Sequence, residues 1–393
     1  MIRPDERADW EGRRDMGTGT GAWLDAGVRG AGDGAGAGTG GAESGTGGAV
    51  SGTPTGTGDT GAAEAPRTRR TANTRSRTGR WRRALLAALV TGAVVIPLSA
   101  AARPEIPAPP PAILAPLMPA TLDEAYAANR ADAAEASRMA AADGDDRRAA
   151  TERAMAAPDR RFLAFDGRGP GQATEVFGDL AHADRVAVLV PGSDTTLDTY
   201  DRFRATALNL HRQLTRDAPN SRTAVVSWLG YETPRTVSST VLTPTRADQA
   251  APHLREFIRQ LHAVTGRGAH ITLVCHSYGT VVCGRAAAGL AVSDIALIGS
   301  PGTGVDSAAG LRTPARVWAA RGADDWIGDV PHVSADLFGT TVGFGTDPVS
   351  PAFGAHVFAA GDVGHSDYFT PGTASLANLA RIVLGETSEV THA

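Results

Sequence analysis

The stretch Ile271–Thr280, which reads ITLVCHSYGT, constrains the fold of this chain more than any other. Apolar, strand-type residues lead into a tight turn, and an alanine-rich helical pattern follows. This predicts a strand, a sharp turn and a helix, with Ser277 at the apex. Such a serine presents its hydroxyl at the carboxyl end of a sheet, and the backbone N–H of Tyr278 can help to bind an oxyanion. Gly279 supplies a small residue after the serine, whereas Cys275 stands where glycine is commonest before it.

Strand and helix patterns alternate through residues 159–393. Most of the expected strands are continuous apolar runs, which is typical of a parallel sheet buried on both faces. The sequence therefore predicts an α/β domain with a mostly parallel, doubly covered sheet. We expect strands near residues 162–165, 173–177, 186–190, 223–228, 271–274, 295–298, 315–320 and 357–360, and helices near 200–216, 246–265, 280–290 and 375–384.

The serine turn resembles the nucleophile elbow of the α/β-hydrolases. Much of residues 160–387 also resembles one actinobacterial branch of that superfamily, long labelled a domain of unknown function. The resemblance implies the α/β-hydrolase fold and a Ser-Asp-His triad. It rests on Arg160–Asp166 (RRFLAFD), Val186–Asp201 (VAVLVPGSDTTLDTYD), Val225–Pro234 (VVSWLGYETP), Cys275–Ala287 (CHSYGTVVCGRAA) and Gly364–Phe369 (GHSDYF).

A second oxyanion donor is expected in the loop directly after the strand VAVLV, where the chain reads Pro191-Gly192-Ser193. In α/β-hydrolases this loop often contains His-Gly, and here proline replaces the histidine. By position, the donor is the backbone N–H of Ser193, paired with that of Tyr278. Losing one such donor typically costs about 2.7 to 4 kcal/mol of transition-state stabilisation. A turn that merely ends a strand would explain Gly192 equally well.

The acid of the triad is expected after the strand ARVWAA. Hydrolases of this fold commonly carry Gly-x-x-Asp there, and the resemblance selects Asp325, which follows Gly322 at that spacing. Asp324 and Asp329 are close alternatives. A carboxylate at this point would hold the catalytic histidine in the correct tautomer and stabilise its charged form.

The base is expected to be His365, which lies in a Gly-His-Ser sequence after the last strand and completes the chain order Ser, Asp, His. His332, His356 and His276 are less favoured. His276 adjoins the serine, but its side chain should point away from the hydroxyl, so we interpret it as a packing residue under the elbow.

The two cysteines, Cys275 and Cys283, lie before the serine and one helical turn after Gly279. Their predicted positions on one face are compatible with a disulfide, which an exported domain would permit, and equally with two small buried thiols. No zinc-ligand spacing, phosphate loop or dinucleotide fingerprint occurs in the sequence, so no metal or cofactor is expected.

The amino-terminal part of the chain carries little folding signal. Residues 1–66 are dominated by Gly, Thr and Ala, and we expect them to be disordered. Residues 67–102 contain an arginine cluster, an apolar run from Ala84 and an A-x-A site, which predict a signal peptide or an uncleaved membrane anchor. A proline-rich linker (103–121) and a helical lead-in (122–158) would precede the catalytic domain (159–393).

The sequence therefore predicts an exported serine hydrolase, secreted or held in the cell envelope, that acts on a small-molecule or lipid carboxylic ester. An acyltransferase, an amidase or peptidase, and a non-catalytic envelope scaffold are the alternatives. The net charge of −4 gives no reason to expect nucleic-acid binding. Membrane contact is expected only through residues 84–102, if they are not cleaved. The segment Tyr231–Pro244 is a candidate cap over the active site, and the oligomeric state stays open.

Overall fold

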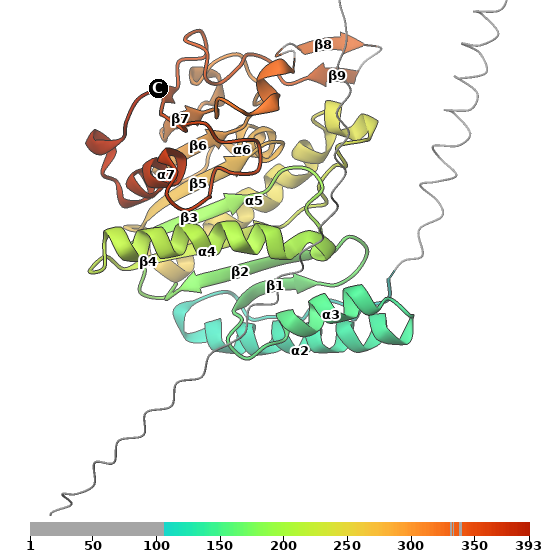
Figure 1. The fold of residues 1–393 in the computed structure, drawn as a ribbon. Helices are drawn as coiled ribbons and strands as arrows, with labels where there is room; N and C mark the ends of the chain where they lie inside the picture. The colour runs from blue at the N-terminus through green and yellow to red at the C-terminus, as the bar shows by residue number, and fades with distance from the viewer. Residues whose placement is uncertain (1–105, 331, 333, 338–339) are drawn as a thin grey trace, which may run out of the picture. The chain divides into compact units, whose positions relative to one another are not determined.

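Apolar runs form a mixed eight-stranded sheet, as the sequence predicts. The computed structural model describes residues 106–393, except 331, 333, 338 and 339 (Figure 1). The order of the strands across the sheet is β1-β2-β4-β3-β5-β6-β7-β10. The strands are β1 (Phe162–Asp166), β2 (Gln172–Gly178), β3 (Arg185–Val190), β4 (Thr223–Leu229), β5 (His270–His276), β6 (Asp294–Ile298), β7 (Arg316–Ala320) and β10 (His356–Val357).

The direction of the strands places the functional loops at one edge. β1 and β2 pair antiparallel, and β2 pairs antiparallel with β4. From β4 to β10 every neighbouring pair is parallel. The carboxyl ends of β3, β5, β7 and β10 therefore meet at the same edge of the sheet, which is where the sequence predicts the oxyanion loop, the serine, the acid and the histidine.

Helices cover both faces of the sheet (Figure 1). Alternate residues of a strand point to opposite faces, so Val188 and Leu189 of β3 belong to different buried clusters. In the cluster that contains Val188, strand side chains pack against helices α5 and α6, and we call it the α5/α6 core. In the cluster that contains Leu189, strand side chains pack against helices α4 and α7, and we call it the α4/α7 core. These helices are α4 (Tyr200–Asp217), α5 (Thr245–Thr265), α6 (Gly279–Ala286) and α7 (Ala374–Leu384).

The lead-in forms two helices, α2 (Leu122–Ala142) and α3 (Asp146–Met155); α2 packs beside β1, and α3 packs against α2. The fully buried Arg148 of α3 donates to Glu152 Oε1 at 2.9 Å, to Asp198 Oδ1 at 3.0 Å and to the carbonyl oxygen of Gly167 at 2.8 Å. Asp198 lies in the connection after β3, which also contains the expected oxyanion loop. The hydrogen bonds of Arg148 therefore link the lead-in to that connection.

Short 3-10 helices lie in several of the connections. Within the described residues they are η1 (Pro119–Thr121), η2 (Leu197–Thr199), η3 (Ser239–Leu242), η4 (Ala309–Leu311), η5 (Trp326–Asp329) and η6 (Thr387–Glu389).

Two predicted elements differ from those observed, and one observed hairpin was not predicted. α6 ends at Ala286 rather than near Leu290, because Gly289 turns the chain with φ of 83°. β10 has two residues rather than four, because the chain after it pairs with the carboxyl terminus, where Phe358 and His392 form a bridge. The hairpin of β8 (Ser334–Leu337) and β9 (Thr340–Gly343) was not predicted.

The predicted amino-terminal features lie outside the described residues. This holds for the Gly/Thr/Ala-rich segment, the arginine cluster and the apolar run 84–102. Among the helices from residue 106 onward that the structure describes, none is both long and apolar enough to span a membrane.

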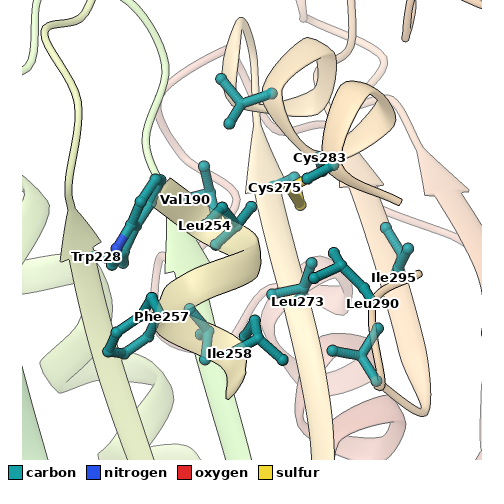
Figure 2. Packing of buried hydrophobic residues seen from close by; sticks show 14 of the residues in the cluster. Val190, Trp228, Leu254, Phe257, Ile258, Leu273, Cys275, Cys283, Leu290 and Ile295 are labelled. Atoms are coloured by element: carbon teal, nitrogen blue, oxygen red, sulfur yellow. A yellow bond between two sulfur atoms is a disulfide. The ribbon is translucent and has the colours of Figure 1, made fainter. Parts of the chain in front are cut away.

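A disulfide joins Cys275 to Cys283, with their Cα atoms 6.4 Å apart (Figure 2). It connects the end of β5 to α6, so that it bridges the turn that carries Ser277. Both cysteines are fully buried in the α5/α6 core, where Leu254 and Leu273 belong to the same cluster. Of the two alternatives that the sequence left open, the structure has the disulfide.

Replacing both cysteines, Cys275→Ala with Cys283→Ala, should lower the free energy of unfolding by about 2 to 3 kcal/mol. The sequence separation of 8 gives a short loop, whose closure restricts the unfolded chain by that amount. Chemical denaturation without reductant measures the difference. The double variant should be insensitive to added reductant, whereas the wild type should be destabilised by it, and equal midpoints under oxidising conditions would contradict the prediction.

Candidate active site

Ser277 sits on the tight turn between β5 and α6 with φ of 54°, a left-handed conformation that residues other than glycine rarely adopt. The turn is crowded. A Cβ atom at Gly279 would lie 2.5 Å from the carbonyl oxygen of Val190, and one at Gly192 would lie 2.6 Å from the Cβ of Ser277. The N–H of Ser277 donates to the carbonyl oxygen of Ile298 at 3.0 Å, which fixes the turn against β6.

The structure brings the predicted triad residues together. Nε2 of His365 lies 2.9 Å from Oγ of Ser277, and Nδ1 of His365 lies 2.8 Å from Oδ1 of Asp325. The alternatives Asp324 and Asp329 are exposed, whereas Asp325 is buried. The three side chains therefore have the geometry of a catalytic triad, in which the histidine can take a proton from the serine while the carboxylate orients the histidine.

Asp325 is held as a carboxylate by its surroundings. The hydroxyl of Tyr368 donates to Oδ2 at 2.5 Å, and the N–H of Ile327 donates to Oδ1 at 2.9 Å. Burial alone would raise the pKa of Asp325, but the hydrogen bonds from His365, Tyr368 and Ile327 outweigh it and hold the pKa below its usual value. The carboxyl is therefore ionised at neutral pH.

Tyr368 is a site residue that the sequence analysis missed. Its hydroxyl also accepts a hydrogen bond from the N–H of Gly322 at 3.0 Å, so it links the acid to the end of β7. Burial and the neighbouring Asp325 raise the pKa of Tyr368 well above its usual value, which keeps the phenol protonated as a donor. Tyr368 lies in the GHSDYF stretch, but no spacing rule distinguishes it there from a packing tyrosine.

The two predicted oxyanion donors are the N–H groups of Ser193 and Tyr278. Within the described part of the chain, neither N–H takes part in a protein hydrogen bond. The loop that carries Ser193 is fixed by Asp194, which has φ of 57°. The N–H of Asp194 donates to the carbonyl oxygen of Pro234 at 3.0 Å, and its carboxylate accepts from the N–H of Thr236 at 3.1 Å.

The other histidines have different surroundings. His332 donates to the carbonyl oxygen of Ser300 at 3.1 Å, and the ring of His356 lies 5.0 Å from that of Trp318. His276 was predicted to pack under the elbow; it is instead half-buried and lines the cavity over Ser277. Its ring lies 4.8 Å from the ring of His365, and its Nε2 donates to the backbone oxygen of His365 at 2.7 Å. His276 therefore also fixes the loop that carries His365, a role that its position in the sequence did not suggest.

A cavity of about 1030 Å³ lies over Ser277. It is lined by the loop after β3, by α4, by the loops after β7 and β10, and by part of β9. The segment Tyr231–Pro244, predicted as a cap, contributes Thr236, Val241 and Leu242 to the lining. It is anchored by the hydroxyl of Tyr278, which donates to the carbonyl oxygen of Thr243 at 2.7 Å. Among the residues that the structure describes, no group of three His, Cys, Asp or Glu side chains is placed to hold a metal ion.

The sheet order and the serine turn define the class of this protein. A mostly parallel sheet with a serine elbow after β5, an acid after β7 and a histidine after β10 is the α/β-hydrolase fold. Residues 166–335 match the model of a family described as alpha/beta hydrolase. The described domain therefore has the α/β-hydrolase fold, as its sequence motifs predicted.

Two relatives from Mycobacterium tuberculosis are named as uncharacterized proteins. Rv2079 of Mycobacterium tuberculosis is 31% identical over 255 residues, an alignment that covers 57% of this chain and 38% of that protein. Rv0963c of the same species is 30% identical over 169 residues, which cover 40% of this chain and 63% of that protein. This chain thus spans less than two thirds of either relative.

Similar solved structures include hydrolases. Esterase PE8 is 18% identical with a TM-score of 0.38, and the match covers 55% of this chain and 98% of that one. XC6422 from Xanthomonas campestris, described as an α/β serine hydrolase without a lid, is 16% identical with a TM-score of 0.36, and covers 58% and 95% of the two chains.

The pH dependence of stability should carry a contribution from His276. Burial, together with the neighbouring His365, lowers the pKa of His276 from 6.5 to about 4. Between these values a proton binds the unfolded chain in preference to the folded one, so stability is lost as the pH falls from 6.5 toward 4. His276→Gln removes this titration and should flatten that part of the profile, by on the order of 1 to 3 kcal/mol at the acid end.

Urea denaturation at a series of pH values measures this effect as the difference between wild type and variant. The matched control is His253→Gln at an exposed position of α5, which should keep the wild-type slope. A His276→Gln profile parallel to that of the wild type would show that His276 does not titrate in this way.

Proposed function

We propose that this α/β-hydrolase cleaves carboxylic esters through an acyl-enzyme on Ser277. The proposal rests on one observation above all. The hydrogen-bonded series Ser277, His365 and Asp325 lies beside two backbone N–H groups, of Ser193 and Tyr278, that have no acceptor in the described protein. A nucleophile, a base, an orienting acid and an oxyanion site are the parts that acyl transfer needs.

The chemistry proceeds in two halves. Oγ of Ser277 attacks the ester carbonyl carbon while Nε2 of His365 takes the hydroxyl proton, and the two backbone N–H groups bind the oxyanion. Collapse of the tetrahedral intermediate breaks the bond to the alcohol oxygen, which receives the proton from His365. Water then attacks the acyl carbon while His365 takes its proton. Collapse of this second tetrahedral intermediate breaks the bond to Oγ of Ser277, which takes the proton back from His365, and the carboxylic acid is released. Asp325 stays ionised throughout and stabilises the imidazolium.

The same residues would also serve an acyltransferase or an amidase. An acyltransferase would present an acceptor hydroxyl in place of water, so product analysis with a competing alcohol distinguishes the two reactions. An amidase would turn over an anilide or amide analogue of the same acyl group at a rate comparable with the ester. A non-catalytic scaffold would neither label with an active-site probe nor turn over any of these substrates.

Fluorophosphonate labelling and hydrolysis of p-nitrophenyl esters test the proposal on the full chain. Ser277→Ala and His365→Ala should each abolish labelling and lower kcat/KM by roughly 10⁴-fold or more, because the triad acts as a unit. His356→Ala, which replaces an exposed histidine outside the cavity, is the matched control and should retain both activities. A folded wild type that neither labels nor turns over would remove the catalytic assignment.

We also propose that the domain is exported. Residues 67–102 have the basic segment, apolar run and A-x-A site of a secretory signal. The disulfide between Cys275 and Cys283 supports an oxidising compartment, since such bonds are rare in the cytosol of most organisms. In cells that express the full chain with a carboxyl-terminal tag, the tag should be found in the medium or on the outer side of the membrane. Recovery of all the tagged protein from the cytosol, with both thiols free, would contradict export.

A further inference from the structure

We infer that the cavity over Ser277 has two apolar limbs, one on each face of the sheet, and that its substrates are esters with extended apolar groups on both the acyl and the alcohol side. This inference rests on the proposed ester hydrolysis and adds the class of substrate to it. The cavity, at about 1030 Å³, lies at the upper end of the range for ligand pockets in proteins.

The first limb lies on the face that α4 and α7 cover. We call it the α4 limb and define it by Leu189, Phe203, Thr206, Val274 and Phe369, all of which line the cavity. Leu189, Val274 and Phe369 belong to the α4/α7 core, and Phe203 packs against it. The limb has a firm wall, because the side-chain amide of Asn209 on α4 donates to the carbonyl oxygen of Phe369 at 3.1 Å.

The second limb lies on the opposite face. We call it the hairpin limb and define it by Val241, Leu242, Tyr278, Val342 and Phe344, which also line the cavity. Tyr278 and Phe344 belong to the α5/α6 core, and Val241 packs against it. The rings of Tyr278 and Phe344 meet edge to face with their centroids 5.6 Å apart, so this wall is also built from packed side chains.

The two limbs meet at the carboxyl edge of the sheet. Consecutive residues of β3, Leu189 and Val190, both line the cavity although they belong to cores on opposite faces. Ser277 follows β5, which neighbours β3, and so lies at the junction. The acyl and alkoxy groups of a bound ester leave the carbonyl carbon in different directions. At such a junction, each can enter its own limb.

The charges in the cavity point to the same class of substrate. Among the described lining residues, Asp194 and Arg202 are the only Asp, Glu, Lys or Arg side chains. The carboxylate of Asp194 already accepts the N–H of Thr236, and Arg202 is exposed on α4. Neither limb therefore places a buried charge where it could pair with an ionic group of a substrate. Apolar chains gain binding from burial alone, by about fourfold in affinity for each methylene.

Two ester series test the inference with the full chain. In one, the acyl group runs from acetyl to dodecanoyl on a fixed alcohol, and in the other the alcohol runs from methyl to dodecyl on a fixed acyl group. The wild type should show kcat/KM that rises by up to about fourfold per methylene in both series, until each limb is full. A preference for short chains in either series would overturn the two-limbed cavity.

Matched tryptophan substitutions fill one limb at a time. Thr206→Trp narrows the α4 limb and Val241→Trp the hairpin limb, both at partly buried positions. Each variant should shorten the optimal chain length in one series only, and the two variants should affect different series. Thr215→Trp, at an exposed position of α4 outside the cavity, should leave both optima unchanged. If both limb variants shorten the same series, or neither shortens any, the inference is wrong.

Binding of dialkyl ketones separates this inference from the proposed reaction, because a ketone needs no hydrolysis. By calorimetry, a ketone with long chains on both sides should bind the wild type at least tenfold more tightly than its methyl ketone counterpart, and both limb variants should weaken its binding. If this pattern holds but no ester is turned over, the proposed reaction fails and the two limbs stand. If esters are turned over but the two ketones bind equally, the limbs fail and the reaction stands.

Discussion

The structure depends on the close approach of backbone around Ser277. A left-handed conformation at a residue other than glycine costs on the order of 1 to 3 kcal/mol and persists only where the surroundings enforce it. On one side, the end of β3 and the loop after it lie so close to the turn that only glycine fits at Gly192 and Gly279. On the other side, the N–H of Ser277 donates to a carbonyl oxygen of β6. The disulfide between Cys275 of β5 and Cys283 of α6 joins the two elements on either side of the turn. The serine hydroxyl is thus held in place before any substrate arrives.

Around this turn, the protein distributes charge so that one histidine can act as base. Asp325 is kept ionised by three hydrogen bonds, and it faces Nδ1 of His365. Burial keeps His276, the neighbour of His365, neutral, and its Nε2–H donates a hydrogen bond to the backbone oxygen of His365. Tyr368 stays protonated and donates to the acid. These groups orient His365 without competing for the proton of Ser277, which is the arrangement that acyl transfer requires.

The parallel sheet connects this site to the cavity. Because β3 and β5 end at the same edge, the residues that follow them stand between the cores on the two faces, and the cavity takes its walls from both. Residues of the segment Tyr231–Pro244 and of β9 line the cavity on the side of the α5/α6 core. The mycobacterial relatives of this chain are named only as uncharacterized proteins, so the shape of this cavity is the main guide to a substrate.

The sequence by itself determined the fold class, nearly all the strands and the candidates Ser277, Asp325 and His365. Local periodicity marks the strands, and the resemblance to α/β-hydrolase motifs marks the three candidate residues. The sequence also marked Ser193 and Tyr278 by their places next to a strand and to the serine. Only the tertiary structure decided between Asp325 and its neighbours, joined Cys275 to Cys283, and showed Tyr368 on the acid. Each of these depends on the direction of a side chain across a gap between distant segments. The short β10 and the two-sided cavity likewise arise from pairing and packing through space, which no local pattern of residues encodes.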